Sequence, residues 1–338
     1  MKIIGTFKDY TDSSVKTVFE KESKNIIEMT LLNNKENMDV VCAPTHNYCN
    51  LGCKMCHLTN DKMSRPMSQI EVDDFLKCLC VTLMSNGKRR TNKDKLLISF
   101  MGVGDPLMNL KLIEDVHENE KIIKRILGYK DISYALATMM PNKKMTKLME
   151  IVNEKNIPLK VHYSMHTPID LNRKKLIPST FVTNKEALSY LARYRELVQS
   201  NNEIMKVYTS FHRTNDPVEI HYTLIKDVND SIEDLHALTN LLKEYNISIK
   251  FIRFNPKEDL EISDKENAWI KYLIEKIPGL RVKRYAPPGK EIGASCGEFT
   301  KHFYQEENET REEKEEYERW REEHQIFEEQ TLYRTLSL

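Results

Sequence analysis

The sequence lacks a long apolar run, a net charge and any feature of an export signal. No stretch of its 338 residues approaches the roughly 20 apolar residues that a membrane span needs, although 40% hydrophobic content is enough for a large core. The first residues, MKIIGTFKDYTDSS, show neither the apolar segment nor the small-residue cleavage site of a signal peptide. We therefore expect a cytoplasmic protein of one or two domains, with no membrane partner.

The absence of net charge neither favours nor excludes a nucleic-acid partner. The 51 basic and 51 acidic residues cancel, but residues 305–338 hold 12 glutamates against five basic residues, so the tail carries −7 and residues 1–304 carry +7. Basic residues of the body cluster in three places: Lys143, Lys144 and Lys147; Arg173, Lys174 and Lys175; and Arg281, Lys283 and Arg284. Each cluster fits either contact with phosphates or an ordinary solvated surface.

Four of the seven cysteines lie within fifteen residues. Cys49, Cys53 and Cys56 are spaced C-x3-C-x2-C, and Cys42 stands seven residues upstream. In a reducing compartment such thiols are more often metal ligands or catalysts than disulfides. Three thiolates can hold three irons of a [4Fe-4S] cluster and leave the fourth iron open to a small molecule. The alternative is a zinc site completed by His46 or His57, although no second close-spaced ligand pair is evident. We expect Cys78 and Cys80 to pack in a core.

Short apolar runs alternate with segments of helical spacing. The runs fall at 39–44, 96–104, 132–138, 159–166, 218–225 and 247–254. Helix-start patterns occur at Ser68–Glu71, which opens a helix expected to end at Gly87, and at Ser231–Asp234. Strand, helix and strand repeated about six times predicts an α/β fold, with a parallel sheet wound as a full or partial barrel.

Unusual residues gather where these runs end. The cysteines follow the first run, GVGDP ends the second, SMHTP the fourth and RFNP the sixth. In parallel barrels, ligand chemistry lies at the carboxyl ends of the strands. The motifs and the predicted fold therefore indicate one site at that end of the barrel.

This combination resembles the radical S-adenosylmethionine (SAM) superfamily. The resemblance implies a partial (β/α)6 barrel, a [4Fe-4S] cluster on Cys49, Cys53 and Cys56, and SAM bound to the open iron and cleaved to a 5′-deoxyadenosyl radical. It also implies an external one-electron donor such as flavodoxin or ferredoxin. The residues that it assigns to the SAM pocket are Gly104, Asp105, Thr138, Ser164, Met165, His166 and Asn255.

Cys42 and Cys296 indicate one type of enzyme within this superfamily. Cys296 lies in the segment Ala294-Ser295-Cys296-Gly297. This pair resembles the RlmN/Cfr type of radical SAM enzymes, which methylate carbon-2 or carbon-8 of adenosine in transfer or ribosomal RNA. The segments at 26–32, 162–178, 220–231 and 251–256 resemble this family in the same order. The resemblance implies that Cys296 is methylated by one SAM, that a radical from a second SAM activates the methyl group, and that the methylene carbon bonds the adenine.

The same resemblance assigns the remaining steps. Glu28 is the expected proton acceptor, and Cys42 then attacks the Cys296 sulfur, forming a disulfide and releasing the methylated base. Thiolate attack at sulfur is ordinary exchange chemistry. Two other functions stay open: the same two-cysteine chemistry on a nucleotide or other small heteroaromatic molecule, and a zinc-stabilised binding module without catalysis.

We expect three parts in the chain. Residues 1–38 form a short β extension that packs on the barrel, 39–303 the catalytic domain, and 304–338 a charged amphipathic helix. Within this helix, Tyr317, Trp320, His324 and Phe327 recur at intervals of three and four, which predicts one aromatic stripe that docks on the barrel or on a second subunit. The resemblance implies that family members usually carry a helical RNA-engaging domain at the N-terminus, and we expect this protein to lack one.

Overall fold

The computed structural model describes residues 1–33, 35–59, 67–85, 88–89, 93–257, 259–290, 292 and 311–327. Cys296, the expected methyl-carrying residue, lies outside these residues. Among the described helices, none is both long and apolar enough to cross a bilayer.

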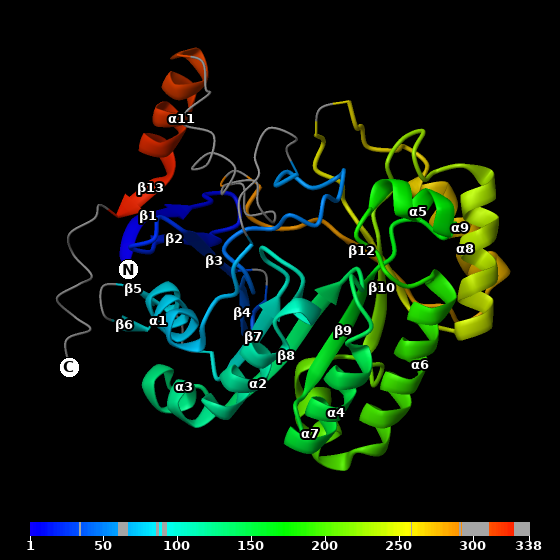
Figure 1. The fold of residues 1–338 in the computed structure, drawn as a ribbon, viewed down its shortest axis with the longest axis horizontal. Coiled ribbons are helices and arrows are strands. Elements are labelled where there is room, and N and C mark those ends of the chain that lie inside the picture. Colours follow the sequence, from blue (N-terminus) through cyan, green and yellow to red (C-terminus); the bar gives the residue numbers. More distant parts are fainter. Residues whose placement is uncertain are drawn as a thin grey trace.

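One large sheet organises the molecule (Figure 1). Its strands lie in the order β12-β11-β10-β9-β8-β7-β4-β3-β2-β1-β13. Those from β4 to β12 are parallel neighbours, and those from β3 to β13 are antiparallel, as is the β3–β4 pair. The strands of the parallel part are β4 (Asp39–Cys42), β7 (Lys95–Phe100), β8 (Asp131–Thr138), β9 (Leu159–Ser164), β10 (Val218–Tyr222), β11 (Ile249–Ile252) and β12 (Val282–Tyr285). Six of these strands coincide with the six predicted runs, so the α/β partial barrel is confirmed.

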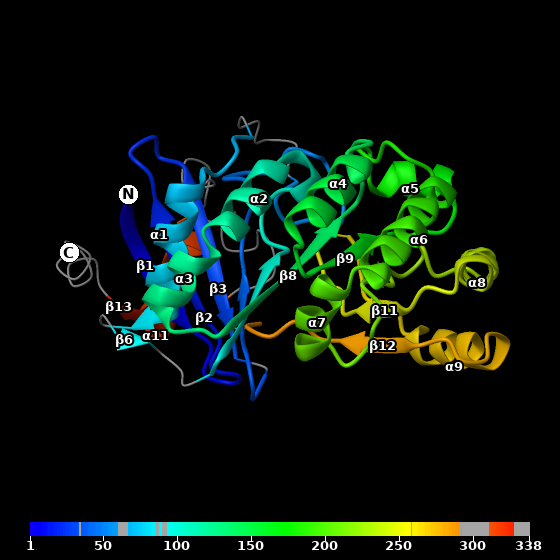
Figure 2. The ribbon, with the colours of Figure 1, turned by 90° about the horizontal axis from the view of Figure 1, so that it is seen from below.

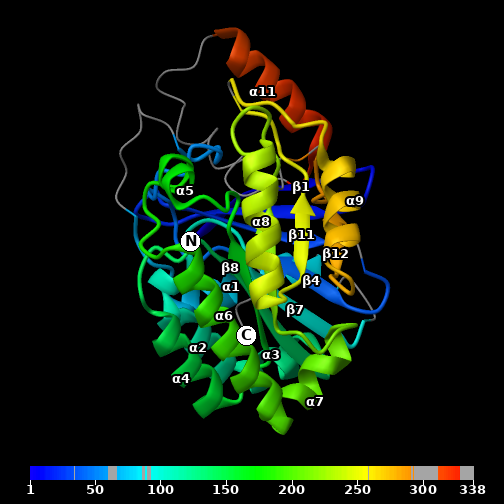
Figure 3. The same ribbon diagram turned by 90° about the vertical axis from the view of Figure 1, so that its right-hand side faces the viewer.

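Helices cover the outer face of the curved sheet (Figure 2). They are α1 (Val72–Leu83), α2 (Leu110–Glu118), α3 (Glu120–Leu127), α4 (Met145–Lys155), α5 (Asp170–Leu176), α6 (Asn184–Ser200), α7 (Asn202–Phe211), α8 (Ile232–Tyr245) and α9 (Glu266–Lys276), with a 3-10 turn η1 at Pro106–Met108. Figure 3 shows α8 and α9 beside β11 and β12. The main core lies between these helices and the sheet, and includes Phe75, Phe100, Tyr134 and Leu188.

The two predicted helix starts have different outcomes. Ser231 caps α8: its hydroxyl accepts from the backbone of Asp234, whose carboxylate accepts from Ser231 in return. The start at Ser68 is wrong. Helix α1 begins at Val72 after Glu71, which makes no side-chain cap. The Ser68 amide instead donates to Asn47 Oδ1 at 2.7 Å, and Gln69 bridges to His46. Through these contacts, Ser68 and Gln69 fix the backbone just before the cysteine loop. Helix α1 ends at Leu83, before the expected Gly87, which lies outside the described residues.

The N-terminal extension continues the barrel wall. It consists of β1 (Lys2–Lys8), β2 (Val15–Glu20) and β3 (Ile26–Leu32), and β3 pairs with β4 so that Thr30 faces Cys42. A separate small pair, β5 (Met84–Ser85) and β6 (Lys88–Arg89), follows α1. Cys78 is fully buried and Cys80 partly buried against the main core, as expected of packing residues.

The charged tail docks on the N-terminal extension. Helix α11 (Arg311–His324) is followed by β13 (Gln325–Phe327), which pairs with β1 (Figure 1). Trp320 stacks on Phe7 of β1 with ring centroids 5.3 Å apart, and Tyr317 and His324 stack on Trp320. Phe327, expected on the helical stripe, is instead in the strand, because the helix ends where the backbone starts to pair with the edge of β1.

Candidate active site

The cysteine loop follows β4 and is fixed by backbone contacts. The Cys56 amide donates to the Cys53 carbonyl at 2.9 Å, which forms a turn around the second and third thiols. Gly52, at φ +73°, has the left-handed conformation that glycine adopts without steric cost. Contacts from α5 and the segment after it hold the loop from outside: the Lys54 amide donates to the Leu176 carbonyl at 3.0 Å, and Ser179 Oγ to the Leu51 carbonyl at 2.7 Å.

The three predicted ligand cysteines are brought together. Burial raises the pKa of the Cys49 thiol to about 12, with the neighbouring Cys56 and Asp105 adding to the effect. Burial also raises the pKa of Cys53 well above its ordinary value, and Cys56 and Cys49 contribute. A bound metal ion supplies the positive charge that these thiols need to lose their protons. All three line one cavity, so the residues present fit a cluster with one iron facing that cavity.

His46, one of the two histidines that could complete a zinc site, does not line this cavity. Its ring lies beneath Gly104, its Nδ1 is 2.9 Å from Thr45 Oγ1, and burial lowers its pKa to about 4. His46 is not among the residues that line the cavity, whereas His57 is. The His46 side chain therefore supports the turn at Gly104 and does not face the three thiols.

The GVGDP segment after β7 approaches the cysteine loop closely. Gly104 has φ +93°, and a Cβ there would lie 2.3 Å from His46 Nδ1. A Cβ on Gly102 would lie 2.7 Å from the Pro44 nitrogen. The Gly104 backbone also hydrogen-bonds to Cys49, which partly offsets the rise in the pKa of that thiol. Only glycine fits at these two positions, and the chain thus presents backbone to the cavity beside the thiols.

Asp105 faces the protein and joins two strand ends. Its carboxylate accepts from the Leu107 amide, the Met139 amide and Thr138 Oγ1, each at 2.9 Å. Burial raises the pKa of this carboxyl to about 6, against the effect of these donors. Thr138 is 1% exposed and also accepts from the Met140 amide at 2.9 Å. Both side chains set the position of the loop after β8; contact of Thr138 with SAM stays a prediction.

Replacement of Asp105 by alanine is expected to lower the free energy of unfolding by about 2–4 kcal/mol, because three buried donors lose their acceptor. Denaturant unfolding of the two proteins measures the difference. Glu150→Ala serves as the control, since Glu150 is about half exposed and makes only a surface ion pair with Lys147. Equal stability of the Asp105→Ala protein and the parent would show that this carboxylate does not join the strand ends.

The SMHTP segment places its three predicted residues differently. Ser164 and His166 line the cavity, whereas the side chain of Met165 is fully buried in the main core. His166 has φ +55°, and its Nδ1 accepts from the Thr223 amide at 3.2 Å. Burial, together with the charge of Arg173, lowers the pKa of His166 to about 3. The ring is therefore neutral at physiological pH.

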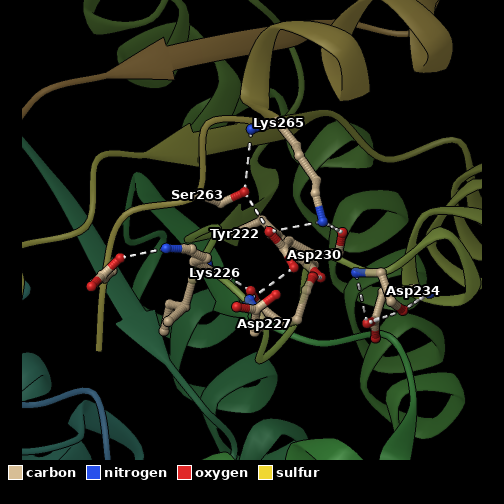
Figure 4. Close-up of polar contacts among 11 residues, drawn as sticks. Tyr222, Lys226, Asp227, Asp230, Asp234, Ser263 and Lys265 are labelled. Atoms are coloured by element: carbon tan, nitrogen blue, oxygen red, sulfur yellow. Dashed lines mark hydrogen bonds and ion pairs between the residues drawn. The ribbon is translucent and has the colours of Figure 1, made fainter. Parts of the chain in front are cut away.

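Asn229 holds the backbone of His166 in this unusual conformation. Its Nδ2 donates to the carbonyls of His166 and Thr223, and its Oδ1 accepts from the Ile225 amide at 2.7 Å. The turn that carries Asn229 is fixed by a network of charged residues (Figure 4). Asp230 accepts from Ser263 Oγ at 2.6 Å and from the Asp227 amide at 3.0 Å, and its Oδ2 lies 3.3 Å from Lys265 Nζ.

Arg173 supports the loops at two strand ends, a role that its position in a basic cluster did not predict. It was grouped above with Lys174 and Lys175 as a basic cluster, but it is fully buried, so phosphate contact by Arg173 is wrong. Its guanidinium donates to the carbonyls of Met139 (2.8 Å), Ser164 (3.2 Å) and Met165 (3.2 Å), and to Thr180. The guanidinium thus joins the carboxyl ends of β8 and β9. The family resemblance of the segment at 162–178 includes this residue but assigned it no role.

The remaining predicted residues are divided between the cavity and the sheet. Cys42 is the last residue of β4 and lines the same cavity as the three clustered cysteines, as does Asn255 after β11. Glu28 lies on β3, is 6% exposed and forms an ion pair with Lys16 at 3.2 Å. Glu28 is not among the described residues that line the cavity. It lies two positions from Thr30, which pairs with Cys42 in the sheet, so the side chains of Glu28 and Cys42 lie on the same face of the sheet.

The cavity has a volume of about 1030 Å³ and extends through the barrel. It reaches from the cysteine loop and the strand ends to residues that precede β4 and β10, such as Asn37 and Thr214. Its described lining is strongly cationic. Asp105 is its one acidic residue, whereas its lysines and arginines are Lys35, Lys160, Arg213, Lys250, Arg253, Lys283 and Arg284. The cavity therefore favours an anionic or phosphate-bearing occupant.

Comparisons with known proteins found relatives in sequence and in fold. No protein-family model matches the chain. The chain is 26% identical over 299 residues to a protein of Clostridioides difficile strain 630 named probable dual-specificity RNA methyltransferase RlmN, covering 86% of this chain and 77% of that protein. A Clostridium botulinum protein of the same name is 24% identical over 310 residues, which is 89% of this chain and 80% of that protein.

A solved structure shares the fold. It is a radical SAM methyltransferase from Sphaerobacter thermophilus, with a TM-score of 0.66 and 19% sequence identity, covering 88% of this chain and 80% of that one. These similarities each cover most of the chain and support an RlmN-type radical SAM family for it.

Proposed function

We propose that this enzyme methylates carbon-2 or carbon-8 of an adenine in transfer or ribosomal RNA, through a methyl group carried on Cys296 and released by Cys42. One observation carries the proposal: Cys42 lies at the end of β4 in the same cavity as Cys49, Cys53 and Cys56. A fourth thiol that were merely structural would have no need to face the cluster cavity. The relatives named as RNA methyltransferases support RNA as the substrate.

The cluster and SAM have residues to hold them. Cys49, Cys53 and Cys56 would bind three irons, and the backbone at Gly104, the strand end at Ser164 and His166, and Asn255 would surround SAM. When bound, these groups supply the radical that removes hydrogen from a methyl group. The protein contributes a neutral His166, a rigid turn at Gly104 and a barrel that limits access of water. An external donor such as flavodoxin or ferredoxin would supply electrons.

Radical chemistry on two cysteines is proposed because an adenine ring carbon does not react directly with SAM. The hydrogen on an adenine ring carbon is scarcely acidic, so this carbon does not become a nucleophile toward SAM by simple proton loss. Cys296 would be methylated by one SAM, a radical from a second SAM would remove a hydrogen atom from that methyl group, and the carbon radical would bond the ring. The adduct would then lose one electron, which the cluster, when bound, would accept, and the ring proton. Cys42 would attack the Cys296 sulfur, forming a disulfide and breaking the bond from sulfur to carbon, and the released carbon would gain a proton to give the methylated base. Glu28, buried beside Lys16, is the proposed acceptor of the ring proton.

The proposal is tested by anaerobic turnover with methyl-labelled SAM and total RNA from which native methylation is absent. Digestion and mass spectrometry of the nucleosides are expected to show 2-methyladenosine or 8-methyladenosine with the parent enzyme and neither product with Cys296→Ala. Label in RNA at any other position would overturn the assignment of the reaction. Label in free nucleotides but not in RNA would favour the same chemistry on a small substrate.

A further inference from the structure

Four charged residues lie near the amino ends of neighbouring strands, at the base of the barrel. Lys160, Glu219, Lys250 and Lys283 are each the second residue of their strands β9, β10, β11 and β12. These strands are parallel neighbours, and Lys250 pairs in register with Lys283. His162 and His221 follow two positions further along β9 and β10, and so share the inward face. All except Glu219 line the cavity.

Glu219 is surrounded by these cations. Its Oε2 lies 2.7 Å from Lys250 Nζ, 3.4 Å from Lys160 Nζ and 3.3 Å from His162 Nδ1, while Lys283 Nζ donates to Oε1. Burial alone would raise the pKa of Glu219, but His162 and the lysine charges bring it well below its ordinary value. The carboxylate is therefore ionised and fully buried.

One carboxylate does not balance three ammonium groups. The group carries a net charge of +2, and each ammonium has three N–H donors while Glu219 offers only two oxygens. Burial lowers the pKa of Lys160 to about 8 in spite of Glu219, and the charges of Lys283 and Lys250 act in the same direction as burial. His221 Nε2 is a second sign of a missing partner: it is buried and has no hydrogen-bond partner within the described part of the chain.

We propose that Lys160, Lys250, Lys283 and His221 form an oxyanion site that binds the phosphate group of the substrate at the base of the barrel. Cations that line a cavity in excess of those needed for Glu219 are stabilised by an anion that accepts several hydrogen bonds, and a phosphate has enough oxygens to contact more than one lysine. Glu219 holds the ammonium groups together and sets their spacing. That the phosphate belongs to an adenine nucleotide rests on the proposed function; the oxyanion site itself does not.

The site lies a suitable distance from the cluster end of the cavity. Ser164 is four residues beyond Lys160 on β9, which corresponds to about 13 Å along a strand. A nucleotide with its phosphate on the lysines would therefore extend its base toward the carboxyl ends of the strands, where the three cysteines and Cys42 lie. The lysines would thus orient the substrate and select a phosphorylated one.

A metal ion is the competing occupant, because ligand atoms of His162, Glu219 and His221 lie within 4.8 Å of one another. Three ammonium groups, however, already surround the Glu219 carboxylate and would repel a divalent cation. The same charges attract an oxyanion. The balance of charge therefore favours the phosphate.

Isothermal titration at low salt tests the proposal, with inorganic phosphate, adenosine, 5′-AMP and a 5′-phosphorylated adenosine-containing RNA oligonucleotide as ligands. We expect 5′-AMP or the oligonucleotide to bind at least about tenfold more tightly than its unphosphorylated form. Lys250→Gln and Lys283→Gln should each remove most of this preference, since each deletes one ammonium donor. Lys111→Gln, on the exposed surface and in none of the basic clusters, is the control and should change nothing.

The titration results distinguish a free nucleotide from RNA as the source of the phosphate, and failure of the oxyanion site from failure of the proposed function. Preference for 5′-AMP over the oligonucleotide identifies a free nucleotide, and the reverse preference identifies RNA. Lysine-dependent binding of phosphate without any effect of the adenine would keep the oxyanion site while removing the adenine substrate of the proposed function. Equal affinities for phosphorylated and unphosphorylated ligands would overturn the oxyanion site. So would one zinc or iron per chain, additional to the cluster, that is lost in His162→Ala. Lys283→Gln keeps the test decisive if Lys250→Gln does not fold, since the Lys283 side chain is 38% exposed.

Discussion

A Cys53→Ala protein, reconstituted anaerobically, is expected to lose its iron–sulfur cluster. The parent should hold about four irons and four sulfides per chain and show the broad visible absorption of a [4Fe-4S] cluster. Removing one of three thiolate ligands leaves two irons without protein ligands, so iron should fall below about one atom per chain. Chemical analysis of iron and sulfide, together with the visible spectrum, measures the loss.

Cys80→Ala is the matched control for this experiment. Cys80 is a partly buried thiol of α1 that packs against the main core and does not line the cavity. It undergoes the same change of side chain, so its protein should keep the full cluster. Stoichiometric zinc in the parent, without iron or sulfide, would instead support the zinc-stabilised binding module and remove the enzymatic interpretation.

A Cys42→Ala protein is expected to be purified with covalently attached nucleic acid. By the proposed chemistry, the adduct between Cys296 and the adenine forms without Cys42 but is released only when Cys42 attacks the Cys296 sulfur. The variant should therefore retain its own substrate through denaturing purification, which is measured by the ratio of absorbance at 260 and 280 nm and by nuclease sensitivity. It should also show no multiple turnover.

The double variant Cys42→Ala/Cys296→Ala distinguishes this trap from ordinary binding. Because it lacks the sulfur that carries the methylene carbon, it should retain no nucleic acid through denaturation, although its cluster cysteines are intact. Retention in both proteins to the same extent would indicate adsorption to the cationic cavity and would count against the role of Cys296.

Much of the fold and of the cluster end could be predicted from the sequence, because the signals are local. Six strands were visible as short β-branched runs, and the spacing of Cys49, Cys53 and Cys56 indicates ligands on one loop. That Cys42 lies in the same cavity follows from its position at the end of a strand. Strand β12 was not predicted as part of the sheet, because its sequence, Val-Lys-Arg-Tyr, alternates weakly and carries two charges.

The base of the barrel could not be predicted, for a physical reason. Lys160, His162 and Ser164 alternate with apolar residues, as do Glu219, His221 and Thr223. Such alternation predicts a polar face but does not say whether that face meets solvent or a polar cavity. Helices cover the outer face here, so the polar face turns inward and collects charges from four strands. Arg173 is a similar case: its neighbours are charged, and only tertiary contacts show that it is buried.

Mass spectrometry of the Cys42→Ala protein, after digestion with trypsin and nuclease, shows whether Cys296 and Cys42 methylate an adenine through a covalent adduct. We expect a peptide containing Cys296 whose sulfur carries an adenine nucleotide through one added carbon. If the cluster is intact and SAM and reductant are present, a Cys296 peptide that never carries either a methyl group or a nucleotide would rule out this chemistry.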